Sequence, residues 1–168
     1  EVSGEVVATG AGVERVKIGD RVAVLPFISC GQCTACLQGD PMGCGQARIM
    51  GSGGVSGGYA EYLLTNEIWC VKLPKSLSFE DGALVEPLAV SLRAARVSGI
   101  KAGDRVLVMG AGAIGLAAAY WARQCGASSV AVSATSTRRQ EMAMAMGIDA
   151  FVIPEEGRTL AQQSEEAL

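Results

Sequence analysis

An apolar run that opens into a glycine pattern constrains this chain more than any other feature. Residues 105–109 read Arg-Val-Leu-Val-Met, and Gly110-Ala-Gly-Ala-Ile-Gly115 then leads into an alanine-rich stretch. This order predicts a strand, a tight turn and a helix. A G-x-G-x-x-G turn suits a dinucleotide, because the free N–H groups and the dipole at the helix start attract the pyrophosphate. The pattern alone is weak evidence, since glycine turns also join strands to helices that bind no ligand.

The sequence after the turn repeats the alternation of strand and helix. A second apolar run at 129–133 follows Gly126, so residues 105–133 have the length of one βαβ unit. A helix over 137–146, closed by Gly147, and a third strand at 151–153 are expected next. We therefore predict an α/β Rossmann domain over residues 94–168, with a doubly wound parallel sheet of which about half is present.

Residues 1–93 predict a different and mainly β domain. Strands are expected over 1–8, 20–24, 59–65 and 68–73, because apolar and β-branched residues alternate with glycine-rich corners. From Ser78 the period becomes helical, since Ser-Phe-Glu-Asp resembles a capping box and apolar residues then lead towards Gly99. Short strands of this kind are typical of a small barrel or sandwich, here incomplete and joined by the helix to the second domain.

The most specific signal is a cluster of four cysteines. Cys30, Cys33, Cys36 and Cys44 form a C-x2-C-x2-C-x7-C pattern with glycines and a proline between the thiols. Four thiolates around one ion leave no open position, which is the coordination of structural zinc. A polar, glycine-rich loop gains its order from such a metal. The pattern therefore predicts a structural zinc lobe over residues 30–44.

Two other interpretations of the cysteines stay open. Unrelated thiols or disulfides are disfavoured by the crowding of the thiols in a chain expected to be cytosolic. An iron–sulfur cluster is the sharper rival, because bacterial ferredoxins also begin C-x2-C-x2-C. Those proteins continue with x3-C-P, whereas this chain has seven residues and then Cys44-Gly45, which favours zinc. Cys70 and Cys125 are interpreted as small buried hydrophobes.

The composition indicates which classes of binding partner to expect. The net charge is −3 with no run of Lys or Arg, which disfavours nucleic acid and anionic membranes and favours a small-molecule substrate. Apolar stretches are broken well before 18 residues, so no membrane span and a cytoplasmic location are expected. A mean hydropathy of +0.31 and two incomplete domains predict a homo-oligomer. The chain contains no histidine, so its chemistry must proceed without an imidazole.

The end of the second predicted strand favours NADP over NAD. Enzymes that use NAD place Asp or Glu about 20 residues past the glycine turn, whereas enzymes that use NADP lack that acid and supply Arg or hydroxyls. Ala134 occupies this position, and no carboxylate precedes Glu141. The alternative is an ordinary helix start with exposed arginines. The candidate cofactor-binding residues are Gly110, Ala111, Gly112, Ala113, Ile114, Gly115, Ser133, Ala134, Thr135, Arg138 and Arg139.

Four segments in this order resemble the zinc-dependent medium-chain alcohol and polyol dehydrogenases. They are the cysteine cluster, the Gly-Gly-Tyr-Ala-Glu-Tyr corner at 57–62, Val-Glu-Pro-Leu-Ala-Val at 85–90 and the glycine turn. The resemblance covers nearly the whole chain. It implies a partial GroES-like catalytic domain that holds a structural zinc lobe and is joined to a Rossmann domain. It also implies a catalytic zinc that polarises an alcohol for hydride transfer.

The resemblance assigns candidate catalytic positions to Glu1 and Glu86. Glu1 and Gly4 match the Glu and last Gly of Gly-His-Glu-x-x-Gly, whose His ligates the catalytic zinc together with an upstream Cys; neither ligand is among these residues. Glu86 stands where classical alcohol dehydrogenases carry a zinc-site cysteine, as in the sorbitol-like branch. A carboxylate buried there needs a metal, a metal-bound water or a cation, although a solvated glutamate on a helix face is the simpler alternative.

Two functions follow. The first is a portion of a zinc-dependent oxidoreductase that transfers hydride between NAD(P) and a secondary alcohol, polyol or sugar, with an alcohol or ketone as its small-molecule partner. The second is a non-catalytic metal-binding or iron–sulfur electron-transfer module, in which the glycine turn is only structural.

Overall fold

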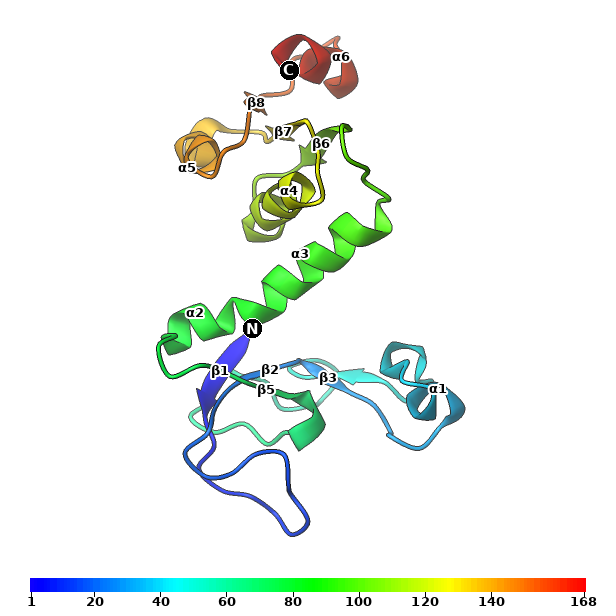
Figure 1. Cartoon of the computed structure of the whole chain (residues 1–168), viewed down its shortest axis with the longest axis vertical. Helices are drawn as coiled ribbons and strands as arrows, with labels where there is room; N and C mark the ends of the chain where they lie inside the picture. Colours follow the sequence, from blue (N-terminus) through cyan, green and yellow to red (C-terminus); the bar gives the residue numbers. More distant parts are fainter. The chain divides into compact units, whose positions relative to one another are not determined.

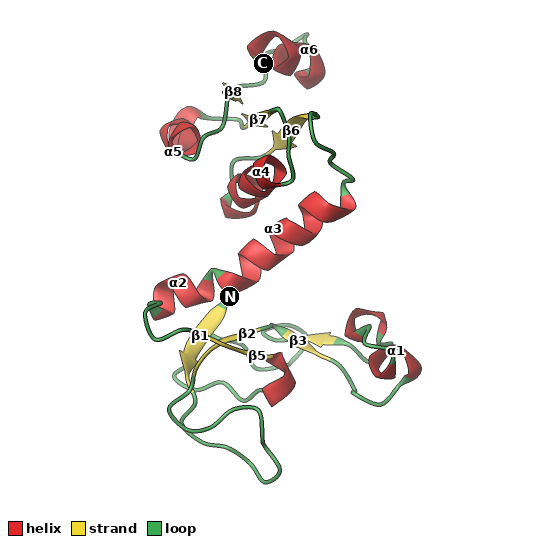
Figure 2. Ribbon diagram, in the orientation of Figure 1, coloured by secondary structure: helices red, strands yellow, loops and turns green.

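In the computed structural model, which describes residues 1–168, the chain divides into two units after Glu86 (Figure 1). The first unit is built on short antiparallel strands (Figure 2). Its main sheet has the order β1-β2-β5, formed by Val2–Glu5, Arg21–Val24 and Cys70–Lys72. A separate pair joins β3 (Phe27–Ile28) to β4 (Arg48–Ile49). Val22, Ala23 and Val24 of the central strand are buried, so the mainly β prediction is confirmed.

The strand predicted at 59–65 is wrong. This segment has no strand partner, and Tyr59, Tyr62 and Leu64 are exposed. A strand needs a hydrogen-bonded neighbour for its backbone, which aromatic and apolar residues in the sequence do not by themselves supply. The preceding corner does pack tightly, because a Cβ at Gly58 would lie 2.1 Å from a methyl of Val2. A hollow of about 600 Å³ is lined by both β1 and this segment.

The strand predicted at 68–73 is shorter than expected because its start is a 3-10 helix, η2 (Glu67–Trp69). Asn66 caps η2 by accepting a hydrogen bond from the Ile68 N–H at 3.0 Å. Likewise β1 is shorter than the predicted 1–8.

Glu67 binds the backbone of the loop that follows β1. Its Oε2 accepts hydrogen bonds from the backbone N–H groups of Arg15, at 2.6 Å, and Glu14, at 2.8 Å. These bonds favour the ionised carboxylate and hold the pKa of Glu67 below its ordinary value. A carboxyl with a lowered pKa in the folded state stabilises the fold above its unfolded pKa of about 4.3, and that contribution is lost as the pH falls through the folded pKa.

Glu67→Gln is therefore expected to lower the free energy of unfolding at pH 7, because the neutral amide accepts these bonds more weakly. Below about pH 4 the difference from the wild type should shrink, since Glu67 itself becomes protonated. Urea unfolding at pH 7 and pH 3 measures both, with the exposed Glu61→Gln as control. An equal difference at the two pH values would contradict this role.

The predicted helix from Ser78 is confirmed but consists of two helices, α2 (Phe79–Ala83) and α3 (Val85–Val97). The Ser78 hydroxyl caps α2 by accepting a hydrogen bond from the Asp81 N–H at 2.9 Å, as the capping pattern predicts. Leu84 separates the two helices as the C-cap of α2. With 13 residues α3 is the longest helix, and none of the helices meets the length and apolar character that a membrane span requires.

The second unit contains a parallel sheet in the order β6-β7-β8. The strands are Arg105–Met109, Ser129–Ser133 and Ala150–Val152. Helix α4 (Ala113–Gln124) connects the first two strands. The segment predicted as a helix over 137–146 is a 3-10 turn, η3 (Thr137–Arg139), followed by α5 (Gln140–Ala145). The alternation of strand and helix that the sequence predicts is thus confirmed.

Both faces of this sheet are covered by helices. Val130 and Val132 face the main core, which includes Leu116 of α4 and Ala143 of α5. The intervening Ala131 is also fully buried, and α6 (Leu160–Ala167) packs on β8 and β7. Figure 1 shows α6 on the side of the strands away from α4 and α5. This arrangement confirms the doubly wound α/β prediction.

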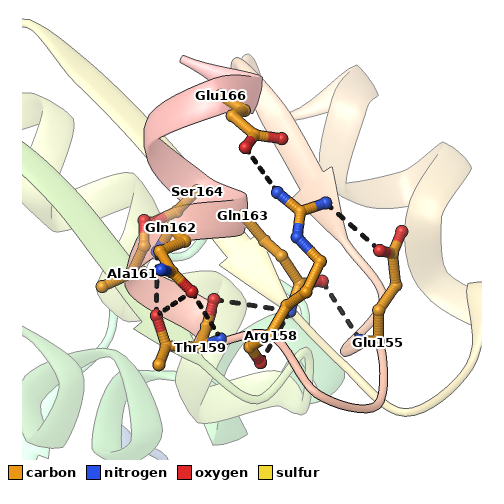
Figure 3. A network of polar contacts seen from close by, with 8 residues as sticks. All are labelled: Glu155, Arg158, Thr159, Ala161, Gln162, Gln163, Ser164 and Glu166. Carbon is orange, nitrogen blue, oxygen red and sulfur yellow. Dashed lines mark hydrogen bonds and ion pairs between the residues drawn. The ribbon is translucent and has the colours of Figure 1, made fainter.

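The start of α6, which the sequence analysis did not predict, is held by a polar network (Figure 3). Thr159 and Gln162 form a reciprocal capping box. Arg158 bridges Glu155, at 3.2 Å, and Glu166, at 2.5 Å. The buried Gln163 accepts from the Glu155 N–H at 3.1 Å, which ties the helix to the loop after β8.

Candidate functional site

The cysteine lobe is shaped by two short helices. Cys33 is the N-cap residue of α1 (Thr34–Leu37), so Cys33 and Cys36 lie one turn apart on one face. Asp40 then caps a 3-10 helix, η1 (Pro41–Gly43), through the Gly43 N–H at 3.3 Å. The buried Cys44 directly follows η1 and lies beside the other three thiols. Asp40 was not among the residues predicted from the sequence, although an Asp-Pro pair is a recognisable helix start.

The four sulfur atoms converge to the spacing that a tetrahedral metal site needs. All four lie within 4.8 Å of one another. Cys33 Sγ is 3.5 Å and Cys30 Sγ is 3.9 Å from Cys36 Sγ. Zinc–sulfur bonds of about 2.3 Å at tetrahedral angles place the sulfurs about 3.8 Å apart. All six cysteines are free thiols in this structure, and the separations of the clustered sulfurs are longer than the ~2.05 Å of a disulfide bond. This geometry favours the zinc interpretation over disulfides, and the donor set fits a single zinc ion.

Backbone N–H groups already point at the sulfurs. The Cys33 N–H lies 3.3 Å from Cys30 Sγ, and the Gln46 N–H lies 3.4 Å from Cys44 Sγ. Hydrogen bonds from the Gln32 and Cys33 backbones favour the thiolate and lower the pKa of Cys30 to about 6. Such bonds orient thiolate ligands and stabilise their charge.

The thiol of Cys33 resists ionisation. The Cys36 N–H lowers the pKa of Cys33, but the neighbouring sulfurs of Cys36 and Cys30 and burial together raise that pKa to about 11. Neighbouring thiolates repel one another, so a cation among them favours the loss of the remaining protons. A divalent metal supplies that charge, and its binding releases the remaining protons.

The glycine turn has the geometry that the sequence predicts. Gly110 adopts φ +107°, a left-handed conformation that favours glycine. A Cβ on Gly115 would lie 1.9 Å from the Gly110 carbonyl oxygen, so helix and strand can approach this closely only with glycine there. Gly112, the N-cap of α4, differs, because a Cβ there meets nothing closer than Arg139 at 3.8 Å. The space over Gly112 is therefore open to a ligand that approaches the backbone.

The structure brings the end of the second strand to this turn. Ser133 ends β7, and its carbonyl oxygen accepts a hydrogen bond from the Gly110 N–H at 2.8 Å. Arg139 Nη1 donates to the carbonyl oxygen of Ala111 at 2.9 Å. Ala134 packs at the edge of the core, whereas Thr135 and Arg138 are exposed. Sequence analysis named Arg139 but had no signal for its contact with the turn.

Glu1 and Glu86 are not brought into a metal-binding group. Glu1 is exposed ahead of β1, and Glu86 is half-buried in the first turn of α3 without an ion pair. The four cysteines are the one group of three or more potential ligands in the chain. A catalytic zinc site normally has three protein ligands, so the residues present do not fit one, and we assign no catalytic step to them.

Family models match both parts of the chain. The alcohol dehydrogenase GroES-like domain matches residues 1–75, and an FAD binding domain matches residues 105–168. The second match covers the glycine turn, which suits the ADP half that flavin and nicotinamide dinucleotides share.

Curated relatives and solved structures give a consistent picture. Sorbitol dehydrogenase of Bacillus subtilis is 35% identical over 88% of this chain and 42% of its own length. L-arabinitol 4-dehydrogenase of Aspergillus niger is 39% identical over the whole chain and 43% of its own length. A structure described as a zinc-binding dehydrogenase of Sinorhizobium meliloti bound to NADP superposes with a TM-score of 0.84 at 37% identity, over 92% of this chain and 45% of that one. The chain thus spans less than half the length of these proteins.

Proposed function

The chain belongs to the zinc-dependent medium-chain alcohol and polyol dehydrogenase family, and we propose that it contributes the structural zinc lobe and the dinucleotide turn of an oxidoreductase. The reaction is hydride transfer between NADP and a secondary alcohol, polyol or sugar. The open approach to Gly112 carries this proposal, because it leaves the N-terminus of α4 accessible to a pyrophosphate. We assign the GroES-like portion to residues 1–93 and the Rossmann portion to residues 94–168.

In this proposal, Cys30, Cys33, Cys36 and Cys44 hold a zinc ion that orders their loop. The spacing of the sulfurs and the N–H groups aimed at them support this assignment. Four thiolates leave no position for substrate, so the ion is structural. Glu1 and Glu86 are the residues of this chain proposed to lie near a catalytic zinc, which would need further ligands that are not among these residues.

Residues 110–115 bind the pyrophosphate, and residues 133–139 bind the adenosine ribose. Ala134 leaves no carboxylate at the end of β7, and Arg139 is held at the turn by Ala111. A cation beside a small residue favours the 2′-phosphate of NADP over the 2′-hydroxyl of NAD. The NADP-bound relative supports this choice.

Ala134→Asp is expected to shift the preference of the chain from NADPH towards NADH by about tenfold or more, because the new carboxylate repels a 2′-phosphate and accepts from a 2′-hydroxyl. Titration with NADPH, NADH and FAD gives the ratio of dissociation constants. The control Thr159→Asp adds the same charge at the N-cap of α6, where Asp also caps.

The same titration tests the proposed function itself. NADPH should bind the unmodified chain more tightly than NADH or FAD, and excess zinc should not be required once the lobe is loaded. Tighter binding of FAD, or of NADH, would refute the NADP assignment. Absence of any dinucleotide binding would refute the proposed role of the turn.

The proposal extends to substrate and assembly. The named relatives suggest a polyol or a related secondary alcohol as substrate. We infer a homo-oligomer in the cytoplasm. The oligomer is supported by the two edge strands β6 and β8, each of which pairs only with β7, and by the exposed Met109 on β6. Light scattering is expected to show a species larger than one chain, and a stable monomer would contradict the inference.

A further inference from the structure

A single buried hydroxyl connects α3 to the glycine motif. Ser91 lies in the middle of α3 and is 0% exposed. Its Oγ is 2.7 Å from the carbonyl oxygen of Pro87, in its own helix, and 3.2 Å from the carbonyl oxygen of Ile114. Ile114 is one of the two residues between Gly112 and Gly115, so the hydroxyl reaches the motif itself.

We propose that Ser91 is a positioning residue for the dinucleotide turn, holding the first turn of α4 where the pyrophosphate meets it. This inference rests on the proposed function, because it concerns the same turn. The hydroxyl has one proton and both neighbours are carbonyl acceptors, so the proton is shared between α3 and α4. Because the Ser91 side chain is fully buried, this shared bond is what satisfies its hydroxyl.

The turn depends on such support because it has few side chains of its own. A Cβ at Gly110 or Gly112 would meet nothing, apart from Arg139 at 3.8 Å from Gly112. Two side chains from elsewhere in the chain therefore hold its carbonyl groups. Arg139 donates to Ala111, and Ser91 donates to Ile114.

A second hydrogen bond joins α3 to α4. Trp121 Nε1, two turns after Ile114 on the same face of α4, donates to the carbonyl oxygen of Leu88 at 3.0 Å. Leu88 follows Pro87 directly, so the bonds of Ser91 and Trp121 meet α3 within one turn. Two hydrogen bonds, from Ser91 to Ile114 and from Trp121 to Leu88, therefore hold α4 against α3 at two points along its length.

The chain offers a matched control. Ser98 stands seven residues after Ser91, at the end of the same helix, and its hydroxyl donates to the carbonyl oxygen of Ala95 at 2.7 Å. This bond joins the residue that follows α3 to the last turn of α3 and does not reach α4. Ser98→Ala removes a helix-backbone bond of the same kind without touching the glycine motif.

The test compares Ser91→Ala and Ser98→Ala in titrations with NADPH and with adenosine 2′-monophosphate. The second ligand has the ribose phosphate but lacks the pyrophosphate. Ser91→Ala should raise the dissociation constant of NADPH about fivefold, the effect of one hydrogen bond, and leave that of the monophosphate within twofold. Ser98→Ala should change neither. Trp121→Phe, which keeps the aromatic packing, should raise the NADPH constant by about twofold.

The outcomes separate this inference from the proposed function. Unchanged NADPH affinity in Ser91→Ala would overturn the positioning role, and so would equal weakening of both ligands, since that reports general loosening of the unit. A wild-type chain that binds no dinucleotide would overturn the proposed function and this inference with it. If Ser91→Ala does not fold, unchanged NADPH binding by Trp121→Phe overturns the inference instead.

Discussion

Replacing Cys33 by serine is expected to remove zinc from the lobe and to leave residues 29–45 disordered. Cys33 caps α1 and contributes one of four converging sulfurs, and three thiolates cannot close a structural zinc site. Because the binding free energy of a structural zinc ion also folds its loop, the loss should be nearly complete. Zinc content per chain and the rate of proteolysis within the lobe measure the two effects.

Cys70→Ser provides the control for this substitution. Cys70 also belongs to the first unit, but its thiol faces the Asn66 carbonyl oxygen at 3.7 Å, outside the cluster. Burial raises the pKa of the Cys70 thiol, in keeping with a neutral side chain that binds no metal. This variant should retain one zinc per chain. Retention of zinc by Cys33→Ser would contradict the four-thiolate site.

Gly115→Ala and Gly112→Ala are expected to fail in different ways. At Gly115 the added Cβ collides with the backbone oxygen of Gly110, which cannot move without breaking the turn, so the second unit should lose about 3 kcal/mol or more of stability. At Gly112, where φ is −71°, the methyl meets only the Arg139 side chain, at an ordinary contact distance of 3.8 Å, so the fold should be retained. The affinity of Gly112→Ala for the dinucleotide should fall at least tenfold, because the methyl occupies the space through which the pyrophosphate approaches.

Urea unfolding and NADPH titration of the two variants distinguish these effects. Gly45→Ala, which meets no atom within 4 Å and has no left-handed φ, controls for the loss of backbone freedom. A stable Gly115→Ala variant would contradict the close packing of helix and strand. Undiminished dinucleotide binding by Gly112→Ala would contradict the placement of the pyrophosphate.

The features fixed by short-range chemistry could be predicted from the sequence. The glycine turn follows from local geometry, because Gly110 adopts a left-handed φ and Gly115 leaves no room for a Cβ beside the Gly110 carbonyl oxygen. The cysteine spacing allowed the four sulfurs to be grouped before the helices between them were known. The cap at Ser78 is equally local.

Features that depend on distant partners could not be predicted. The aromatic and apolar residues at 59–65, which follow a glycine-rich corner, are typical of a strand, but whether this segment becomes one depends on an available sheet edge. The bond from Arg139 to Ala111 spans 28 residues, and the bond from Ser91 to Ile114 spans 23. Neither pair has a sequence pattern of its own, because each is created by the packing of helices around the parallel sheet.

Native mass spectrometry with added NADPH tests most directly whether one chain holds both a zinc ion and a dinucleotide. The expected result is a chain mass increased by one zinc ion and, at saturating ligand, by one NADPH. Cys33→Ser should lose only the first increment and Gly112→Ala only the second. A chain that carries iron and sulfide in place of zinc, or that takes up no dinucleotide, would contradict the account.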